Sequence, residues 1–515
     1  MDNNKSLVSA STYHSEDIMV LKYESTRNNQ VKVSPSEAVV KGLSDDGGLF
    51  VPREIDKLEL DLQEMCSFGF HDTAKKILSL FFPDFSAEQI NDSVVNAYDG
   101  KFDDASIVPV VKVGDRFIME LFHGSTIAFK DIALSILPYL MKKAQSNCKM
   151  KEDIVILTAT SGDTGKAALE GFKDVEGTKI IIFYPNDGVS TVQEMQMVTT
   201  EGDNTYVVAV EGNFDDAQSA VKEIFNDLAL REKLGDMGLK FSSANSINIG
   251  RLVPQISYYF STYADLVKKN EIQMGDAINF VVPTGNFGNI LAGFFAKQLG
   301  LPVNKLICAA NENNVLYDFL TTGVYDINRE FKKTMSPSMD ILISSNLERL
   351  LYFMSDKDNA YIAELMGQLK TQKKYEVNDA IKAKIKDQFW SSYCSEADTT
   401  DTVKKVYDTF GYVLDTHTAV AYKVYEDYLK ANDDQSKTVI LSTASPFKFT
   451  GSVYKALFGN TDIEELKLIK ELSDKTGVDV PAQIDGLGER AVRHNRLCTP
   501  ASMADEILAI LSETK

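Results

Sequence analysis

The sequence predicts an α/β protein in which helices flank open, mostly parallel sheets. From about residue 153 to residue 268, short runs of β-branched residues alternate with segments of helical spacing. A second alternation begins near residue 279. The chain has 515 residues. Since a single core stops growing at about 250–300 residues, we expect two or three domains.

The first alternating unit contains three expected strands, each followed by a helix. The strands are rich in Val, Ile, Tyr and Phe and end at turn residues. We expect them at 153–160, 178–185 and 205–210, and the helices at 166–175, from about residue 191, and at 214–228. Strands that alternate with helices of this length form βαβ units, which predicts a parallel sheet.

A second unit starts with an expected strand at 279–283 and its flanks. It continues through the turn TGNFGN into a helix at 290–300 and a strand at 305–313. Residues 325–405 are richer in charge, so we interpret them as an inserted, mostly helical subdomain. The apolar run that begins at residue 438 predicts a further buried strand, which ends in a polar cluster by residue 446.

Composition and charge narrow the class of protein. The formal net charge is -20, which argues against a nucleic-acid or membrane partner. The N-terminus lacks the order of a secretory signal, and no apolar run reaches the roughly 18 residues of a membrane helix. The five cysteines are scattered without a C-x-x-C pair, which argues against a disulfide scaffold or a metal site. We therefore expect a cytoplasmic location.

The first candidate for chemistry is HGSTIAFKD, which runs from His123 to Asp131. Lys130 lies among apolar residues at an expected helix start. Burial there would lower the pKa of its ammonium and free an amine nucleophile, as a Schiff-base lysine requires. Alone, the segment also fits a solvated helix lysine whose stem packs on the core.

Two glycine-containing turns form the next candidates, and each joins a strand to a helix. PTGNFGN (283–289) would aim backbone N–H groups and a helix N-terminus at one point, which suits a phosphate ester. TSGDTG (160–165) offers hydroxyls, backbone donors and one carboxylate, Asp163, at the edge where ligands of open α/β sheets gather. Plain strand-to-helix turns, with Ser161 or Asp163 as an N-cap, are the alternative.

The fourth candidate is STASP (442–446), after the strand that begins at residue 438. A hydroxyl at this strand end could meet a pyridine nitrogen and leave it neutral. An ordinary turn is the alternative.

These segments, in this order, resemble those of the threonine synthase family, in the tryptophan-synthase β group of pyridoxal-phosphate enzymes. The resemblance extends from about residue 20 to residue 450 and onward. It also includes NSINIGRLVPQISYY (245–259), SPSMDILISSNLERLL (336–351) and DTHTAVAY (415–422). It implies fold type II, with two open, mostly parallel twisted sheets, an N-terminal region and a helical insertion.

The resemblance also implies a division into domains. The N-terminal region would be 1–100 and the small α/β domain 153–249. The insertion would be 325–405, and the large cofactor-binding domain would combine 101–152, 250–324 and 406–515.

By position, the resemblance implies roles for individual residues. Lys130 would carry pyridoxal 5'-phosphate as a Schiff base and act as general base. The expected cofactor contacts are Gly285, Asn286, Phe287, Gly288 and Asn289 at the phosphate, and Thr443, with Ser442 as the nearby alternative, at the pyridine nitrogen. The expected substrate contacts are Thr160, Ser161, Asp163, Thr164, Asn245, Ser246, Arg251, Ser345, Asn346 and Arg349.

The resemblance implies conversion of O-phospho-L-homoserine and water to L-threonine and phosphate, by γ-elimination and β-addition of water. A phospho-lyase that releases a 2-keto acid, ammonia and phosphate is the alternative. A non-catalytic anion-binding protein is a rival of another class, which Lys130 argues against. A nicotinamide enzyme is disfavoured because G-x-G-x-x-G is missing.

Three positions depart from the family pattern. Ser125 stands where proline is common, Asp415-Thr416-His417 replaces Asp-Pro-His, and Ser445 replaces a histidine. The last departure removes an ionisable group near the expected cofactor.

Overall fold

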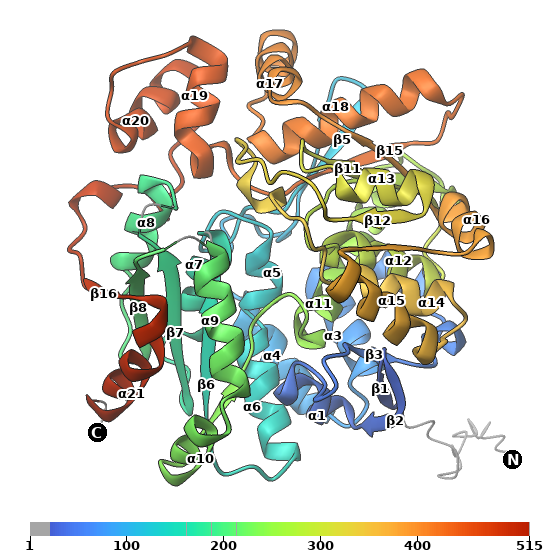
Figure 1. The fold of residues 1–515 in the computed structure, drawn as a ribbon. Helices are drawn as coiled ribbons and strands as arrows, with labels where there is room; N and C mark the ends of the chain where they lie inside the picture. Colours follow the sequence, from blue (N-terminus) through green and yellow to red (C-terminus); the bar gives the residue numbers. More distant parts are fainter. Residues whose placement is uncertain (1–20, 161, 187, 213, 514–515) are drawn as a thin grey trace, which may run out of the picture.

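The computed structural model describes residues 21–160, 162–186, 188–212 and 214–513 (Figure 1). Two sheets dominate it, and both are largely parallel, which confirms the predicted α/β class. The smaller sheet, drawn in green with β16 in red, lies beside the larger one. Ser161 is an expected substrate contact that lies outside the described residues.

The larger sheet has six strands in the order β14-β11-β10-β15-β5-β4. All neighbours are parallel except β4 and β5, which form an antiparallel pair. The strands are β4 (Val110–Val113), β5 (Arg116–Glu120), β10 (Ile278–Pro283), β11 (Val303–Ala310), β14 (Phe389–Tyr393) and β15 (Thr438–Ser442).

The smaller sheet has five parallel strands in the order β16-β8-β7-β6-β9. Its strands are β6 (Asp153–Ala159), β7 (Thr178–Pro185), β8 (Thr205–Val210), β9 (Leu239–Ser242) and β16 (Arg496–Cys498). The three strands expected in this unit are therefore confirmed, each within one residue.

Both sheets are covered on two faces, which explains why central strands such as β7 and β10 are continuous apolar runs. In β10, Phe280 belongs to one core and Val281 to another. In β6, Ile156 belongs to the same core as Phe280, whereas Val155 faces a third cluster. One core thus joins the inner faces of the two sheets. Sheets covered on both faces favour apolar residues at every strand position.

Helices pack on these faces and on the junction between the sheets. Those of the smaller sheet and the junction are α5 (Lys130–Leu134), α6 (Leu137–Asn147), α7 (Asp163–Phe172), α8 (Thr191–Val198), α9 (Phe214–Asn226), α10 (Leu228–Asp236) and α11 (Ile249–Lys268). Those of the larger sheet and the C-terminal part are α12 (Gly288–Gln298), α13 (Val315–Thr322), α18 (Thr416–Ala431), α19 (Thr450–Phe458), α20 (Glu465–Thr476) and α21 (Met503–Glu513), with short 3-10 turns η3 (Pro446–Phe449), η4 (Leu487–Glu489) and η5 (Pro500–Ser502).

The remaining elements form the N-terminal region and the insertion. The N-terminal region contains β1 (Tyr23–Ser25), β2 (Asn28–Val33), α1 (Pro35–Lys41), β3 (Phe50–Pro52), η1 (Ile55–Lys57), α2 (Leu62–Ser67), α3 (Phe70–Phe81) and α4 (Ala87–Tyr98). The insertion contains β12 (Val324–Asp326), η2 (Pro337–Met339), α14 (Leu347–Met354), α15 (Asn359–Gln372), β13 (Lys374–Glu376), α16 (Asp379–Gln388) and α17 (Glu396–Phe410).

Two strands cross the expected domain limits. β14 lies within the segment expected to be a helical insertion, yet it extends the larger sheet beside β11. β16 lies in the C-terminal segment expected with the larger domain, yet it pairs with β8 of the smaller sheet. Both are edge strands of three to five residues, too short to show a periodic pattern in sequence.

In the described part of the chain, no helix combines the length and the apolar character needed to cross a bilayer. β6, β10 and β15 each end in one of the polar turns singled out above. Ligand sites of open α/β sheets lie beyond such carboxyl ends. The fold thus directs three of the candidate segments toward one region.

Candidate active site

Lys130 is held in place by the turn that follows β15. Phe129 N–H donates to the Thr443 carbonyl at 2.8 Å, and Ser445 N–H donates to the Ile127 carbonyl at 3.0 Å. Ala128 and Ala444 form an antiparallel bridge between the same two segments. The lysine segment and the strand end, more than 300 residues apart in sequence, therefore form one unit.

Asp131 organises the same loop from within. Its buried carboxylate accepts from Thr126 N–H at 2.8 Å and from the Thr126 hydroxyl at 2.6 Å. A Cβ at Gly124 would lie 2.6 Å from this carboxylate, so the loop requires glycine there. Burial raises the pKa of Asp131 to about 6. Asp131 thus has a structural role that fixes the backbone leading to Lys130.

The Lys130 side chain is only 13% exposed, and its ammonium lies 3.7 Å from Asp163 Oδ2. The same nitrogen lies 5.0 Å from the centre of the Phe129 ring. Burial lowers the pKa of Lys130; Asp163 opposes this shift, and the positive charges of Arg251 and Lys448 add to it. The sequence predicted an amine of this kind.

Asp163 is the first residue of α7 and directs its carboxylate into the site. Gln193 Nε2 donates to Oδ1 at 2.8 Å, and the Ser338 hydroxyl donates to Oδ2 at 2.6 Å. Lys448 Nζ lies 3.5 Å from Oδ1. Burial alone would raise the pKa of Asp163, but Lys448 and Lys130 hold it well below its usual range. The helix is capped by Gly162 rather than by an aspartate or serine side chain.

The other described members of the TSGDTG turn have different roles. The Thr160 hydroxyl accepts from the N–H groups of Gly162 and Gly165, at 3.0 and 2.9 Å, so it stabilises the turn. Gly162 has φ of 130° and packs so closely on Gln193 that a Cβ would lie 2.5 Å from it. Thr164 is half-buried. Within the described turn, Asp163 is the residue that carries charge.

The PTGNFGN turn leaves its donors open. Phe287 adopts a left-handed conformation with φ of 63°, and the helix that follows has no side-chain cap. A Cβ at Gly285 would lie 2.7 Å from the Ser338 carbonyl. Asn289 Oδ1 accepts from Tyr258 and Tyr259, at 2.6 and 2.9 Å, while its buried Nδ2 has no partner among the described residues.

Backbone donors, an open helix N-terminus and an unpaired amide N–H group all suit a phosphate. The turn therefore fits the phosphate ester of pyridoxal phosphate.

Several expected substrate contacts come together beside this turn. Ser246 Oγ and Ser345 Oγ lie 3.4 Å apart, and Ser345 Oγ is also 3.4 Å from Asn286 Oδ1. Asn346 donates to the carbonyls of Ser246 and Asn286, both at 3.1 Å. Asn245, half-buried, belongs to the same loop. The structure thus brings these residues together, with the two serines and Asn286 presenting side chains and Asn346 fixing the backbone.

The two arginines expected to contact substrate differ in their surroundings. Arg349 is fully buried, and its guanidinium donates to the carbonyls of Phe50 and Ile247 and to Asn346 Oδ1. Arg251 is also buried, donates to the Ala244 carbonyl at 2.9 Å and pairs with no carboxylate in the described structure. Its Nε is buried and has no hydrogen-bond partner among the residues that the structure describes. Burial lowers the pKa of Arg251 to about 10, so Arg251 is charged at neutral pH and has a donor for an anion.

The turn after β15 provides the expected hydroxyls. The Ser442 hydroxyl already accepts from Thr418 Oγ1 at 3.0 Å. Thr443 uses its carbonyl for Phe129, as described above. Ser442 also hydrogen-bonds with the Tyr412 side chain, so Thr443 is the better candidate of the two for a pyridine nitrogen. Ser445, at the position where the family has histidine, uses its hydroxyl to accept from Phe447 N–H at 3.3 Å.

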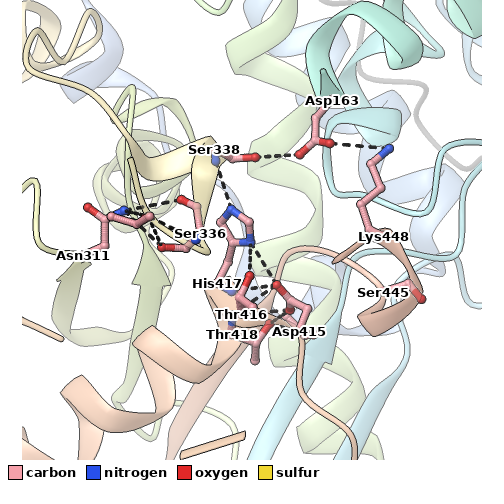
Figure 2. A network of polar contacts seen from close by, with 12 residues as sticks. Asp163, Asn311, Ser336, Ser338, Asp415, Thr416, His417, Thr418, Ser445 and Lys448 are labelled. Atoms are coloured by element: carbon pink, nitrogen blue, oxygen red, sulfur yellow. Dashed lines mark hydrogen bonds and ion pairs between the residues drawn. The ribbon is translucent and has the colours of Figure 1, made fainter. Parts of the chain in front are cut away.

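A chain of polar contacts links the lysine end of the site to this strand end (Figure 2). From Asp163 it passes to Ser338, whose N–H donates to His417 Nε2 at 3.1 Å. His417 Nδ1 lies 3.1 Å from Asp415 Oδ1, and Thr418 donates to the other oxygen. Since a backbone N–H can only donate, Nε2 is the acceptor of this bond, and Nδ1 is the ring nitrogen that faces Asp415.

Sequence reasoning did not assign four residues of the site: Lys448, His417, Ser338 and Gln193. Lys448 is flanked by Phe447 and Phe449, the same signal of a lysine among apolar residues that identified Lys130. His417 lies in a segment recognised as a motif, where the only signal was its place one residue into a helix.

Three family descriptions match the chain. The family described as "Threonine synthase N terminus" matches residues 22–98. Pyridoxal-phosphate dependent enzyme matches residues 114–444, and Threonine synthase, C-terminal matches residues 418–499. The second match contains Lys130, the turns at 160–165 and 283–289, and the start of the turn at 442–446.

Individual relatives agree with these matches. Threonine synthase-like 1 of Homo sapiens is 40% identical over 435 residues, which are 82% of this chain but 58% of the human protein. Threonine synthase of Saccharomyces cerevisiae is 35% identical over 491 residues, which are 88% of this chain and 94% of the yeast protein. The crystal structure of PLP-bound threonine synthase from Brucella melitensis is 33% identical with a TM-score of 0.84, covering 96% of this chain and 99% of the other.

Proposed function

Because this chain belongs to the threonine synthase family of pyridoxal-phosphate-dependent enzymes, we propose that it is a threonine synthase. It would convert O-phospho-L-homoserine and water to L-threonine and inorganic phosphate. Pyridoxal 5'-phosphate is its cofactor, and the enzyme is a lyase of that cofactor class. This substrate carries a phosphate group of its own, so the site would hold two phosphates, one from the cofactor and one from the substrate.

We propose that three segments hold the cofactor. Lys130 would bind it covalently through its amine, the turn at 285–289 would hold its phosphate, and Thr443 would face its pyridine nitrogen. When bound, pyridoxal phosphate supplies an electron sink for bond cleavage next to the substrate amino group. The low exposure of Lys130 and the unpaired amide of Asn289 support this assignment.

The single observation that supports a phosphorylated substrate best is Arg251. A buried guanidinium without a carboxylate is costly, and an incoming anion would compensate it. With the turn at 285–289 assigned to the cofactor phosphate, Arg251 provides a second anion site. The side chains of Ser246 and Ser345 would add hydroxyl donors beside it. Dehydratases with an unphosphorylated substrate do not need this second charge.

Lys130 is the natural base in this arrangement. Its lowered pKa gives a larger fraction of free amine near neutral pH than an exposed lysine has. An amine released from the cofactor would be within reach of the proton on the substrate α-carbon. Asp163 lies 3.7 Å from the nitrogen and would hold the protonated form in the site. The protonated Lys130 would then return the proton to the substrate.

The contacts of Asp163 with Ser338 and Lys448 connect α7 to the insertion and to the C-terminal segment. They close the site between the two sheets, which would exclude bulk water from the reacting atoms. Only a few water molecules would then reach the site for the addition step.

A phospho-lyase that releases a 2-keto acid and ammonia is the second candidate. It is kept because human threonine synthase-like 1, which is 40% identical, has a name that does not specify a synthase reaction, and because Ser445 stands in place of the family histidine, whose role cannot be transferred to this chain. Incubation of the loaded enzyme with phosphohomoserine, with phosphate, threonine and 2-keto acid measured in one sample, distinguishes the two. Threonine in equal amount to phosphate supports the synthase. Keto acid in equal amount supports the lyase, and no phosphate release contradicts both.

We propose a cytoplasmic location, on the basis of the scattered, unpaired cysteines and the acidic composition. A small-molecule substrate is the expected partner. Microscopy of the tagged chain in its own cells tests the location.

A further inference from the structure

Lys448 is a lysine at the centre of the site that the proposed reaction does not use. Its side chain has no exposed area. It donates to the Thr126 carbonyl at 3.0 Å and to Gln196 Oε1 at 3.0 Å, and its third neighbour is Asp163 Oδ1 at 3.5 Å. Lys448 therefore has two hydrogen bonds and one ion pair within the protein.

The arrangement places two ammonium groups on one carboxylate. Lys448 is next to Oδ1 of Asp163, and Lys130 is next to Oδ2. Ser338 and Gln193 also donate to these two oxygens. The carboxylate is therefore shared among four donors, and Lys130 has the longest of the four separations, 3.7 Å. Figure 2 shows Lys448 and Ser338 on opposite sides of Asp163.

We propose that Lys448 is a positioning residue for the cofactor lysine. Through the Thr126 carbonyl it holds the loop that carries Lys130, and through Oδ1 it takes up part of the Asp163 charge. It thereby prevents a close ion pair between Lys130 and Asp163 and keeps the Lys130 amine available to an aldehyde. This inference rests on the proposed role of Lys130.

The charges around Lys130 shift its pKa in known directions. Three charged groups act on Lys130 from the surrounding elements: Asp163 of α7, Lys448 of η3 and Arg251 of α11. Asp163 raises the pKa of Lys130, and the two cations lower it. Removing the positive charge of Lys448 should therefore raise this pKa, and removing the negative charge of Asp163 should lower it. A purely structural role for Lys448 would not predict opposite shifts.

The test measures how fast the full-length protein, freed of cofactor, forms its covalent adduct with added pyridoxal phosphate between pH 6 and pH 10. Adduct formation is followed by absorbance, and Lys130 is identified by borohydride reduction and peptide mass spectrometry. At pH 7, Lys448→Gln should react more slowly than the native protein, by about tenfold for each unit by which the pKa of Lys130 rises. The difference should vanish at high pH, where the amine is free in both proteins.

Two further variants make the test specific. Lys448→Arg retains the charge and should retain the native pH midpoint. Asp163→Asn should move the midpoint to lower pH. Lys166→Gln is the matched control, because Lys166 is also buried but bonds to Glu170 and Thr200 instead of Asp163. Its midpoint should be native.

Each outcome has a clear meaning. A native midpoint in Lys448→Gln, or an upward shift in Asp163→Asn, overturns the inference about Lys448. If Lys448→Gln does not fold, the arginine and asparagine variants still decide between the two directions. If the native protein forms no adduct at Lys130, the proposed cofactor role itself fails, which is a separate result.

Discussion

The two strand-to-helix turns of the site begin alike and end with opposite electrostatic character. The TSGDTG turn satisfies its own backbone through the Thr160 hydroxyl and presents the carboxylate of Asp163. The PTGNFGN turn has no side-chain cap, and the unpaired Asn289 Nδ2 lies at its helix start. One turn attracts ammonium groups and the other attracts anions.

The difference shows that a glycine-containing turn does not by itself define a phosphate site. A helix N-terminus favours negative charge, and this charge can come from the protein or from a ligand. At α7 the first residue, Asp163, is itself negatively charged. At α12 no acidic side chain belongs to the turn, which suits the proposed cofactor phosphate. The residues at the first helical positions therefore give the two turns different preferences for the charge of a ligand.

Removing the amine of Lys130, which we place between the two turns, should have the largest effect on enzyme activity. Lys130→Ala should lower threonine and phosphate release by about 10³-fold or more, because both the covalent link and the proton acceptor are lost. Lys130→Arg should be equally inactive, since it keeps the charge but lacks the nucleophilic amine. Product release and cofactor absorbance are measured together. Normal turnover in either variant would exclude Lys130 from the chemistry.

Closing the anion turn should have the next largest effect. In Gly285→Ala the new Cβ would lie 2.7 Å from the Ser338 carbonyl, so the backbone must shift. Such overpacking costs about 1–3 kcal/mol and should weaken cofactor binding by about tenfold or more. Gly451→Ala is the control, because its nearest atom is 3.5 Å away. Equilibrium dialysis with pyridoxal phosphate measures the affinity; equal affinities in the two variants would contradict the geometry.

Two substitutions should distinguish the arginine that would bind the substrate phosphate from the arginine that stabilises the fold. Arg251→Gln should raise KM for phosphohomoserine by about ten- to a hundredfold, the loss expected for a charged hydrogen bond of about 1.5–3 kcal/mol. Arg349→Gln should chiefly lower the free energy of unfolding, because it leaves buried carbonyls unpaired. Steady-state kinetics and urea unfolding are measured on both variants. The reverse pattern would assign the substrate phosphate to Arg349.

The smallest effect is expected at the contact between Asp163 and the insertion. Ser338→Ala removes the 2.6 Å bond to Asp163, worth about 1 kcal/mol, and should lower kcat/KM by about fivefold. Ser336→Ala is the control, since its hydroxyl bonds to Asn311 instead. A larger loss in the control than in Ser338→Ala would show that the insertion acts through its general stability.

Much of the fold could be predicted because its signals are local. The strands that became β7 and β8 were expected over the same residues, since buried parallel strands are continuous β-branched runs bounded by turn residues. β5 and β9 were not expected. They are four to five residues long, and they become strands because neighbours in the sheet complete their hydrogen bonds.

The candidate site was predicted in part. Lys130, Asp163 and the turn at 285–289 lie in segments whose order resembles a known family, and the structure brings Lys130 and Asp163 together. Lys448 and His417 were not assigned, because neither has a spacing that marks a ligand site. Their roles depend on contacts such as Lys448 with Thr126, which is 322 residues away in sequence.

The sequence by itself determined the alternation of strands and helices, the three polar turns and the lysine among apolar residues. Each depends on backbone preference and apolar pattern over a few neighbouring positions. Only the tertiary structure decided that Arg349 donates to three protein oxygens while Arg251 donates to one and keeps a buried Nε without a partner among the described residues, and that one carboxylate is shared by two lysines. These outcomes depend on which distant groups are buried together, because desolvation and pairing set the charge that each side chain can offer.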